Sequence, residues 1–120
     1  MKGETNFIKE KSFRFAIRIV HLHKLLQYRS ETVLSKQLLR SGTSVGALIR
    51  ESEQAESRAD FIHKLSIALK EADETEYWLA LLHETEYLNE KEYGSIVNDC
   101  RELLRILTAI IKTSKTNKNE

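Results

Sequence analysis

A chain of 120 residues that contains no proline and a single cysteine is long enough to bury the core of one domain. The lone cysteine excludes an intrachain disulfide and favours a reducing compartment. The first ten residues lack the apolar run of a signal peptide, and no run of 18 apolar residues occurs, which predicts a cytoplasmic protein that makes no membrane contact.

The first predicted helix begins at about Thr5 or Ser12 and ends at Tyr28. Its apolar residues fall on two adjacent lines, with Phe13, Ile17 and Val20 on one and Phe15, Ile19, Leu22 and Leu26 on the other. Another face carries cations at spacings of three and four residues, at Lys11, Arg14 and Arg18, followed by His21. This row is typical of the solvated side of an amphipathic helix, but it also fits a nucleic-acid phosphate backbone.

The second predicted helix covers residues 33–54, after good N-cap residues in Ser30-Glu31-Thr32. Within it, Gly42 and Gly46 are four residues apart and share one face. A phosphate-binding Walker loop is the alternative interpretation of this glycine stretch. That motif requires Gly-Lys-Ser/Thr after a strand, whereas here Ala47 follows and the helical apolar period continues. We therefore predict that Gly42 and Gly46 let a neighbouring helix approach closely.

Two longer helices complete the chain. Ser57, followed three residues later by Asp60, predicts the start of a third helix that runs to about His83. Asn89 and Glu92 form a capping-box pattern before a fourth helix that ends near Lys112. Residues 113–120 contain no large apolar residue and predict a frayed tail.

Four long helices with short connections predict an all-α fold, an antiparallel up-and-down four-helix bundle, in one domain of residues 1–112 with a flexible tail of residues 113–120. The apolar surface of the first, third and fourth helices exceeds what one bundle interior requires. Wide apolar faces usually indicate association, so we expect a homo-oligomer.

The charged residues are segregated along the chain, although the net charge is only +1. Residues 1–50 carry ten Lys and Arg against three acids, and residues 51–99 carry four against thirteen. Mutual attraction of the helices, within or between chains, explains this pattern. The alternative is binding of RNA or DNA by basic faces of the first two helices, and the candidate residues are Lys11, Arg14, Arg18, Lys36, Arg40 and Arg50.

Catalytic and metal-binding patterns are weak. Di-iron bundles need two Glu-x-x-His motifs, and the nearest match is the single Asp60-Phe61-Ile62-His63. Cys100 lies among apolar helix positions, which predicts a buried, inert thiol. We therefore predict no catalytic residue, no metal site and no cofactor, and we expect that the protein is not an enzyme.

Three segments together resemble a known bacterial family: VLSKQLLRSGTSVGA at residues 33–47, ADFIHKLSIALKEA at 59–72 and ETEYWL at 74–79. They are similar to the four-helix-bundle proteins encoded in 23S ribosomal RNA intervening sequences, over roughly residues 12–112. The resemblance implies a bundle that assembles as a ring, typically a homopentamer, without known catalytic activity.

A related branch of this fold comprises the accessory variability determinants of diversity-generating retroelements. Its members form basic pentamers that bind nucleic acid and a reverse transcriptase, which implies RNA, DNA or a partner protein as ligands besides the chain itself. The present sequence departs from that branch, because its net charge is only +1.

Overall fold

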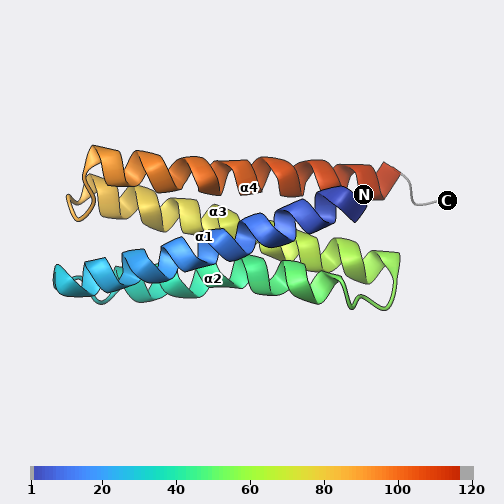
Figure 1. The fold of residues 1–120 in the computed structure, drawn as a ribbon, viewed down its shortest axis with the longest axis horizontal. Coiled ribbons are helices and arrows are strands. Elements are labelled where there is room, and N and C mark those ends of the chain that lie inside the picture. Colours follow the sequence, from blue (N-terminus) through green and yellow to red (C-terminus); the bar gives the residue numbers. More distant parts are fainter. Residues whose placement is uncertain (1, 117–120) are drawn as a thin grey trace.

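The computed structural model describes residues 2–116, with the side chains of residues 2 and 4 left undescribed. This part of the chain forms four α-helices and no strands: α1 (Lys2–Tyr28), α2 (Leu34–Ser52), α3 (Arg58–Glu84) and α4 (Glu90–Thr116) (Figure 1). The predicted all-α class and the four helices are thus confirmed. Helix α1 begins earlier than the predicted start at Thr5 or Ser12.

Neighbouring helices run antiparallel along an axis of 51 Å, in a rod whose other extents are 22 and 19 Å (Figure 1). Each helix packs against its neighbours in the chain, and α1 also packs against α4, so that α1 and α3 lie diagonally across the bundle. The α1–α4 pair makes the least intimate of these contacts. Figure 1 shows α1 crossing obliquely from α4 towards α2.

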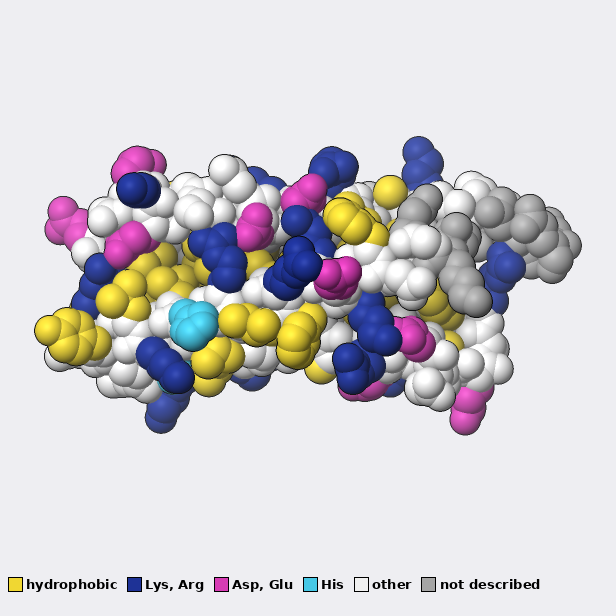
Figure 2. Space-filling model, in the orientation of Figure 1, with side chains coloured by type: hydrophobic (Ala, Val, Ile, Leu, Met, Phe, Trp, Pro, Cys, Tyr) yellow, Lys and Arg dark blue, Asp and Glu magenta, His cyan; other side chains and the backbone are white. Residues whose placement is uncertain are grey.

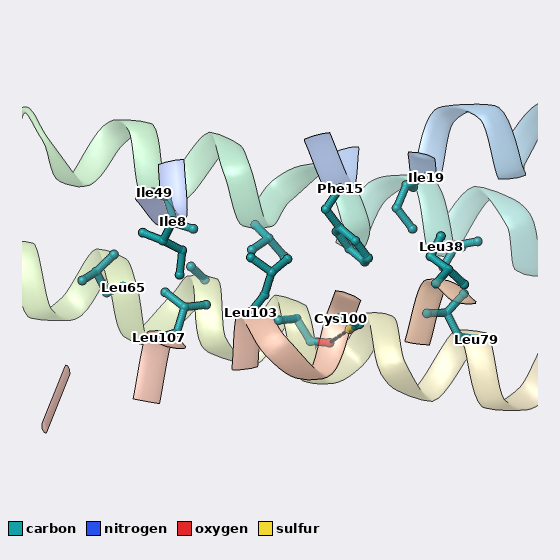
Figure 3. Close-up of a cluster of buried hydrophobic side chains, with 14 of the residues drawn as sticks. Ile8, Phe15, Ile19, Leu38, Ile49, Leu65, Leu79, Cys100, Leu103 and Leu107 are labelled. Atoms are coloured by element: carbon teal, nitrogen blue, oxygen red, sulfur yellow. Dashed lines mark hydrogen bonds between the residues drawn. The ribbon is translucent and has the colours of Figure 1, made fainter. Parts of the chain in front are cut away.

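The core is a column of apolar side chains contributed by all four helices (Figure 3). On α1, Ile8, Phe15, Ile19 and Leu26 recur at helical spacing and are 0–2% exposed. Leu38 and Ile49 of α2 face them, and the other two helices contribute Leu65, Leu79, Leu103 and Leu107. Of the two apolar lines predicted on the first helix, only the line through Phe15 and Ile19 is therefore a core line.

The starts of α3 and α4 follow the predicted capping patterns. Ser57 Oγ accepts a hydrogen bond of 3.0 Å from the amide of Asp60, which caps α3. At α4, Asn89 and Glu92 exchange two hydrogen bonds, because each side chain accepts from the other residue's amide at 2.8 and 2.9 Å. This reciprocal pair is the capping box that the sequence predicts.

Helix α2 begins at Leu34, one residue after the predicted start. Ser30 lies in the left-handed region with φ of 65°, and Val33, at the N-cap position, makes no side-chain cap. The carboxylate of Glu31 instead accepts from the amides of Leu34 and Ser35 at 3.2 and 2.7 Å. Only 7% of Glu31 is exposed, so the capping group within the predicted stretch of residues 30–32 is a buried acid.

The end of α4 also differs from the prediction. The helix continues to Thr116, four residues beyond the predicted end at Lys112, and Ser114 is buried at 4% exposure. Part of the predicted tail of residues 113–120 is therefore helical. The remainder, residues 117–120, lies outside the described residues.

Candidate interaction surface

The two glycines of α2 face α1 at the closest approach of the two helices. A Cβ atom at Gly42 would lie 2.8 Å from Cγ1 and 2.9 Å from Cγ2 of Ile19, which is fully buried. At Gly46 a Cβ would lie 3.3 Å from the main-chain oxygen of Ser12. The glycine stretch thus lies within an uninterrupted helix and has no side chain at the two positions that face α1. Its amides belong to the hydrogen-bonded backbone of α2.

The hydroxyls around these glycines are satisfied inside the bundle. Thr75 Oγ1 of α3 donates a 2.9 Å hydrogen bond to Ser41 Oγ, and both residues are fully buried. Ser44 and Thr43 donate to carbonyls one turn back in α2, at 2.6 and 2.7 Å. None of these four hydroxyls is presented as a ligand for a phosphate group.

Four of the six predicted nucleic-acid-binding cations form ion pairs within the chain. Arg18 of α1 bonds Asp99 of α4 at 2.6 Å, and Arg14 bonds Glu10 at 2.5 Å. Lys11 contacts Glu102, and Arg40 contacts both Glu71 and Glu74. The pair of Arg14 lies within α1, whereas the pairs of Lys11, Arg18 and Arg40 join two helices and support the interpretation that segregated charges attract the helices to each other.

The Arg40 cluster is the most connected of these pairs. Its guanidinium donates to Glu71 at 3.2 Å and contacts Glu74, whose Oε2 also accepts a 2.9 Å bond from Trp78 Nε1. The hydrogen bond from Trp78, followed by that from Arg40, lowers the pKa of Glu74. Arg40 therefore links α2 to α3 and is already engaged by two carboxylates.

The remaining two predicted cations have a different environment. Lys36 and Arg50 are exposed on α2, and neither forms an ion pair with a described side chain. Lys24 on α1 is likewise exposed and unpaired within the described part of the chain. Lys36 and Arg50, and Lys24, which the sequence does not single out, are thus exposed cations that the ion pairs of the described residues do not use.

The second apolar line of the first helix lies on the outer surface of α1. Phe13 is 60% exposed, Ile17 is 43% exposed and Val20 is half-buried. We call these three residues the α1 stripe. Figure 2 shows hydrophobic side chains gathered along α1, with Lys and Arg side chains on either side. The stripe contributes nothing to the core of its own bundle, so its apolar surface is available to another surface.

A shallow groove runs between α1 and α4, where the two helices contact each other least. Leu22, Leu25 and Ile96 form its apolar floor, and the volume of this part is about 450 Å³. Arg18 and Lys91 lie at its rim. The Arg18 guanidinium is held by Asp99 and by Ser95 Oγ at 2.8 Å, so it is a structural link between the helices.

The histidines and acids do not form a metal centre among the described side chains, where no three potential ligands come together. Asp60 Oδ2 accepts a bond from the amide of Glu56 at 3.2 Å, while His63 is exposed. His83 stacks on Tyr93 with ring centroids 4.3 Å apart. In residues 2–116, no helix has both the length and the hydropathy that crossing a bilayer requires.

Cys100 lies in the core and is fully buried, and its Sγ donates to the carbonyl of Ala72 at 3.3 Å (Figure 3). Burial raises the pKa of this thiol to about 12, and the nearby carboxylate of Glu76 adds to the rise. The thiolate is the nucleophilic form of cysteine, so the environment of Cys100 suppresses its reactivity.

We expect Cys100 in the folded protein to react with an aromatic disulfide reagent at neutral pH roughly a thousandfold more slowly than in the unfolded chain. Absorbance of the released thiol measures both rates, and the same protein in denaturant supplies the reference. Rapid labelling without loss of helical structure would contradict the burial of this thiol.

Comparison with known proteins shows what the chain is similar to. The family model of the 23S rRNA-intervening sequence protein matches residues 4–109. A crystal structure from Bacteroides thetaiotaomicron VPI-5482, of a protein with unknown function from the S23 ribosomal protein family, is 60% identical with a TM-score of 0.89. The match covers 91% of the present chain and 98% of that chain. The comparison with curated proteins found no match. The sequence, the four-helix fold and the family match agree, and the chain belongs to the 23S rRNA-intervening sequence protein family.

Proposed function

We propose that this protein is a non-enzymatic homo-oligomer, a scaffold whose copies associate through the α1 stripe. The observation that carries the proposal is the exposure of Phe13 and Ile17, which are 60% and 43% exposed on a helix that already has a complete core face. Exposed apolar patches of this kind mark association sites. We expect the assembly to be a closed ring, and the family resemblance implies five copies of the 13.9 kDa chain.

The stripe is suited to burial because its residues are stiff or aromatic. Covering the exposed parts of Phe13 and Ile17 contributes roughly 1–2 kcal/mol for each side chain. Such a contribution alone does not overcome the cost of association. A closed ring repeats the contact at every junction and leaves no stripe exposed, whereas a pair joined head to tail would leave one stripe uncovered.

Nucleic-acid binding is the alternative function, and it would depend on the same region of the surface. Lys11, Arg14, Arg18 and Arg40 already contact carboxylates of the chain, which leaves two of the six predicted cations for phosphate contacts. Non-specific binding to nucleic acid requires several unpaired cations, because each phosphate contact adds a modest increment. The arrangement therefore favours self-association.

The proposal predicts that the wild-type protein is oligomeric at micromolar concentration and that Phe13→Glu/Ile17→Glu shifts it to the monomer. Placing two carboxylates in an apolar contact costs several kcal/mol for each junction, since the charges lose water without gaining partners. Light scattering coupled to size-exclusion chromatography measures the mass, and circular dichroism checks that the bundle is intact.

The matched control is Asn98→Glu/Thr108→Glu, which adds the same two charges to exposed positions of α4. This control is expected to keep the wild-type mass. A wild-type protein that is monomeric at tens of micromolar, or a stripe variant that retains the wild-type mass, would overturn the proposed function.

A further inference from the structure

The outer surface of α3 carries a second apolar line, which is bracketed by acids. Asp73, Tyr77, Leu81 and Glu84 recur at spacings of four, four and three residues, so they lie along one side of α3. We call these four residues the α3 face. Tyr77 is 59% exposed and Leu81 is half-buried, and the two acids are exposed. Neither Asp73 nor Glu84 forms an ion pair with a described side chain.

The α1 stripe is bracketed in the same way by cations. Lys24 continues its line at the C-terminal end, four residues after Val20. On α2, the carbonyl oxygen of Ser35 lies 3.2 Å from His23 Nδ1 of α1. Lys36 is the next residue, so it lies near the same end of the stripe. Glu53 of the chain after α2 forms a 2.9 Å ion pair with Lys9, near the start of α1. Arg50 lies three residues before Glu53. Arg50 therefore lies near the other end.

The charges that flank the two apolar surfaces are mostly opposite in sign. Asp73 and Glu84 are eleven residues apart on one helix, which is about 16 Å. Lys36 and Arg50 are fourteen residues apart, which is about 21 Å. Each surface thus has an apolar centre with charges near both ends, which are cationic beside the α1 stripe and acidic at Asp73 and Glu84 of α3, where the exposed Lys70 lies three residues before Asp73. The bundle itself uses neither set of charges, among the ion pairs of the described residues.

We propose that the α1 stripe of one copy, with its flanking cations, docks on the α3 face of a second copy. This inference rests on the proposed self-association and specifies which surface receives the stripe. Because α1 and α3 are diagonal in the bundle, each copy has one donor surface and one acceptor surface on different sides. The contact is therefore heterologous, and such contacts repeat from copy to copy, forming a ring where the rotation between copies closes.

The alternative is an isologous contact, in which the stripes of two copies pack on each other. That contact would bring the cations of both copies together, because Lys24, Lys36 and Arg50 lie on the same side as the stripe. Like charges at an interface disfavour binding, whereas the α3 face supplies charges of the opposite sign. The charges on the two surfaces therefore select the α3 face as the partner.

Charge reversal on both surfaces tests the pairing. Lys36→Glu/Arg50→Glu and Asp73→Lys/Glu84→Lys are each expected to raise the dissociation constant of the assembly at least about tenfold at low salt. The variant that combines all four substitutions restores opposite charges across the contact, and we expect its dissociation constant to return to within about threefold of wild type. Mass photometry over a dilution series measures the three constants.

Two further measurements make each outcome decisive. Lys112→Glu/Lys115→Glu reverses two exposed cations of α4 and is expected to leave the mass unchanged, and thermal unfolding checks that every variant is folded. If wild type assembles but Asp73→Lys/Glu84→Lys assembles equally well, the α3 face is not the acceptor and only this inference fails. Failure of the combined variant to recover overturns it as well. A monomeric wild type would instead refute the proposed function.

Discussion

Replacing Gly42 with leucine is expected to lower the free energy of unfolding by about 3 kcal/mol. The Cβ atom alone would lie 2.8 Å from Cγ1 of Ile19, and Ile19 is fully buried, so it has no free space to move into. Leucine is a better helix former than glycine by about 1 kcal/mol, which offsets only part of the steric cost. Helices α1 and α2 must separate to admit the side chain.

Chemical denaturation followed by circular dichroism measures this change, and another helical glycine supplies the control. A Cβ atom at Gly94 of α4 would meet no atom within 4 Å, so Gly94→Ala is expected to stabilise the protein by roughly 0.5–1 kcal/mol. Gly46→Leu is expected to resemble Gly42→Leu, because its Cβ would press on the main chain of Ser12 at 3.3 Å. Equal stability of Gly42→Leu and wild type would refute the close contact.

The second large effect is expected at Glu92, at the start of α4. Its carboxylate accepts two hydrogen bonds from the Arg29 guanidinium, at 2.7 and 2.9 Å, and one from the amide of Asn89. Glu92→Ala removes the cap, worth about 1 kcal/mol, and a partly exposed charge-assisted pair, worth up to about 1 kcal/mol. We therefore expect a loss of about 2 kcal/mol in the free energy of unfolding.

This contribution should depend on pH. The hydrogen bonds from Arg29, and then that from Asn89, lower the pKa of Glu92 from 4.5 to about 2. A carboxyl group whose pKa is lower in the folded state stabilises the fold fully above its unfolded pKa. This stabilisation is lost as the pH falls from about 4.5 towards about 2, because the unfolded chain takes up the proton first.

Glu92→Gln removes the charge of the side chain and keeps its size, so it isolates the contribution of the ionised carboxylate. The difference in unfolding free energy between wild type and Glu92→Gln should shrink as the pH is lowered through this range, as measured by denaturation at each pH. Glu86→Gln, in the connection before α4, is the control, since Glu86 forms no ion pair with a described side chain. A difference that does not change with pH would show that the charge of Glu92 does not contribute.

Local sequence signals predicted most of the fold because most of the fold is determined locally. The caps at Ser57 and at Asn89 with Glu92 involve residues three apart, so the pattern alone identifies both helix starts. The stretch Ser30-Glu31-Thr32 was predicted to cap α2, but the sequence did not show which of its residues does so, because the burial of Glu31 is not visible in a motif. The last turn of α4 was missed because Ser114 is buried by other parts of the chain, although its own segment is polar.

The charged residues were harder to interpret than the helices. Spacing places Lys11, Arg14 and Arg18 on one line of a helix, but it does not reveal that α4 supplies Asp99 and Glu102 opposite two of them. Arg18 and Asp99 are 81 residues apart in the sequence, so no local pattern predicts that they form an ion pair. Likewise, only the packing distinguishes the outer line of α1 from its core line.

Which helices are neighbours in the bundle also determines how the chain can fold before it associates. Consecutive helices are neighbours in space, and short connections join them. Contacts between neighbours in sequence form rapidly, because little chain entropy is lost in closing each hairpin. One chain can thus complete its bundle without a second chain. The α1 stripe and the α3 face then exist on a folded monomer, and the rate of their association would depend on concentration while the rate of folding would not.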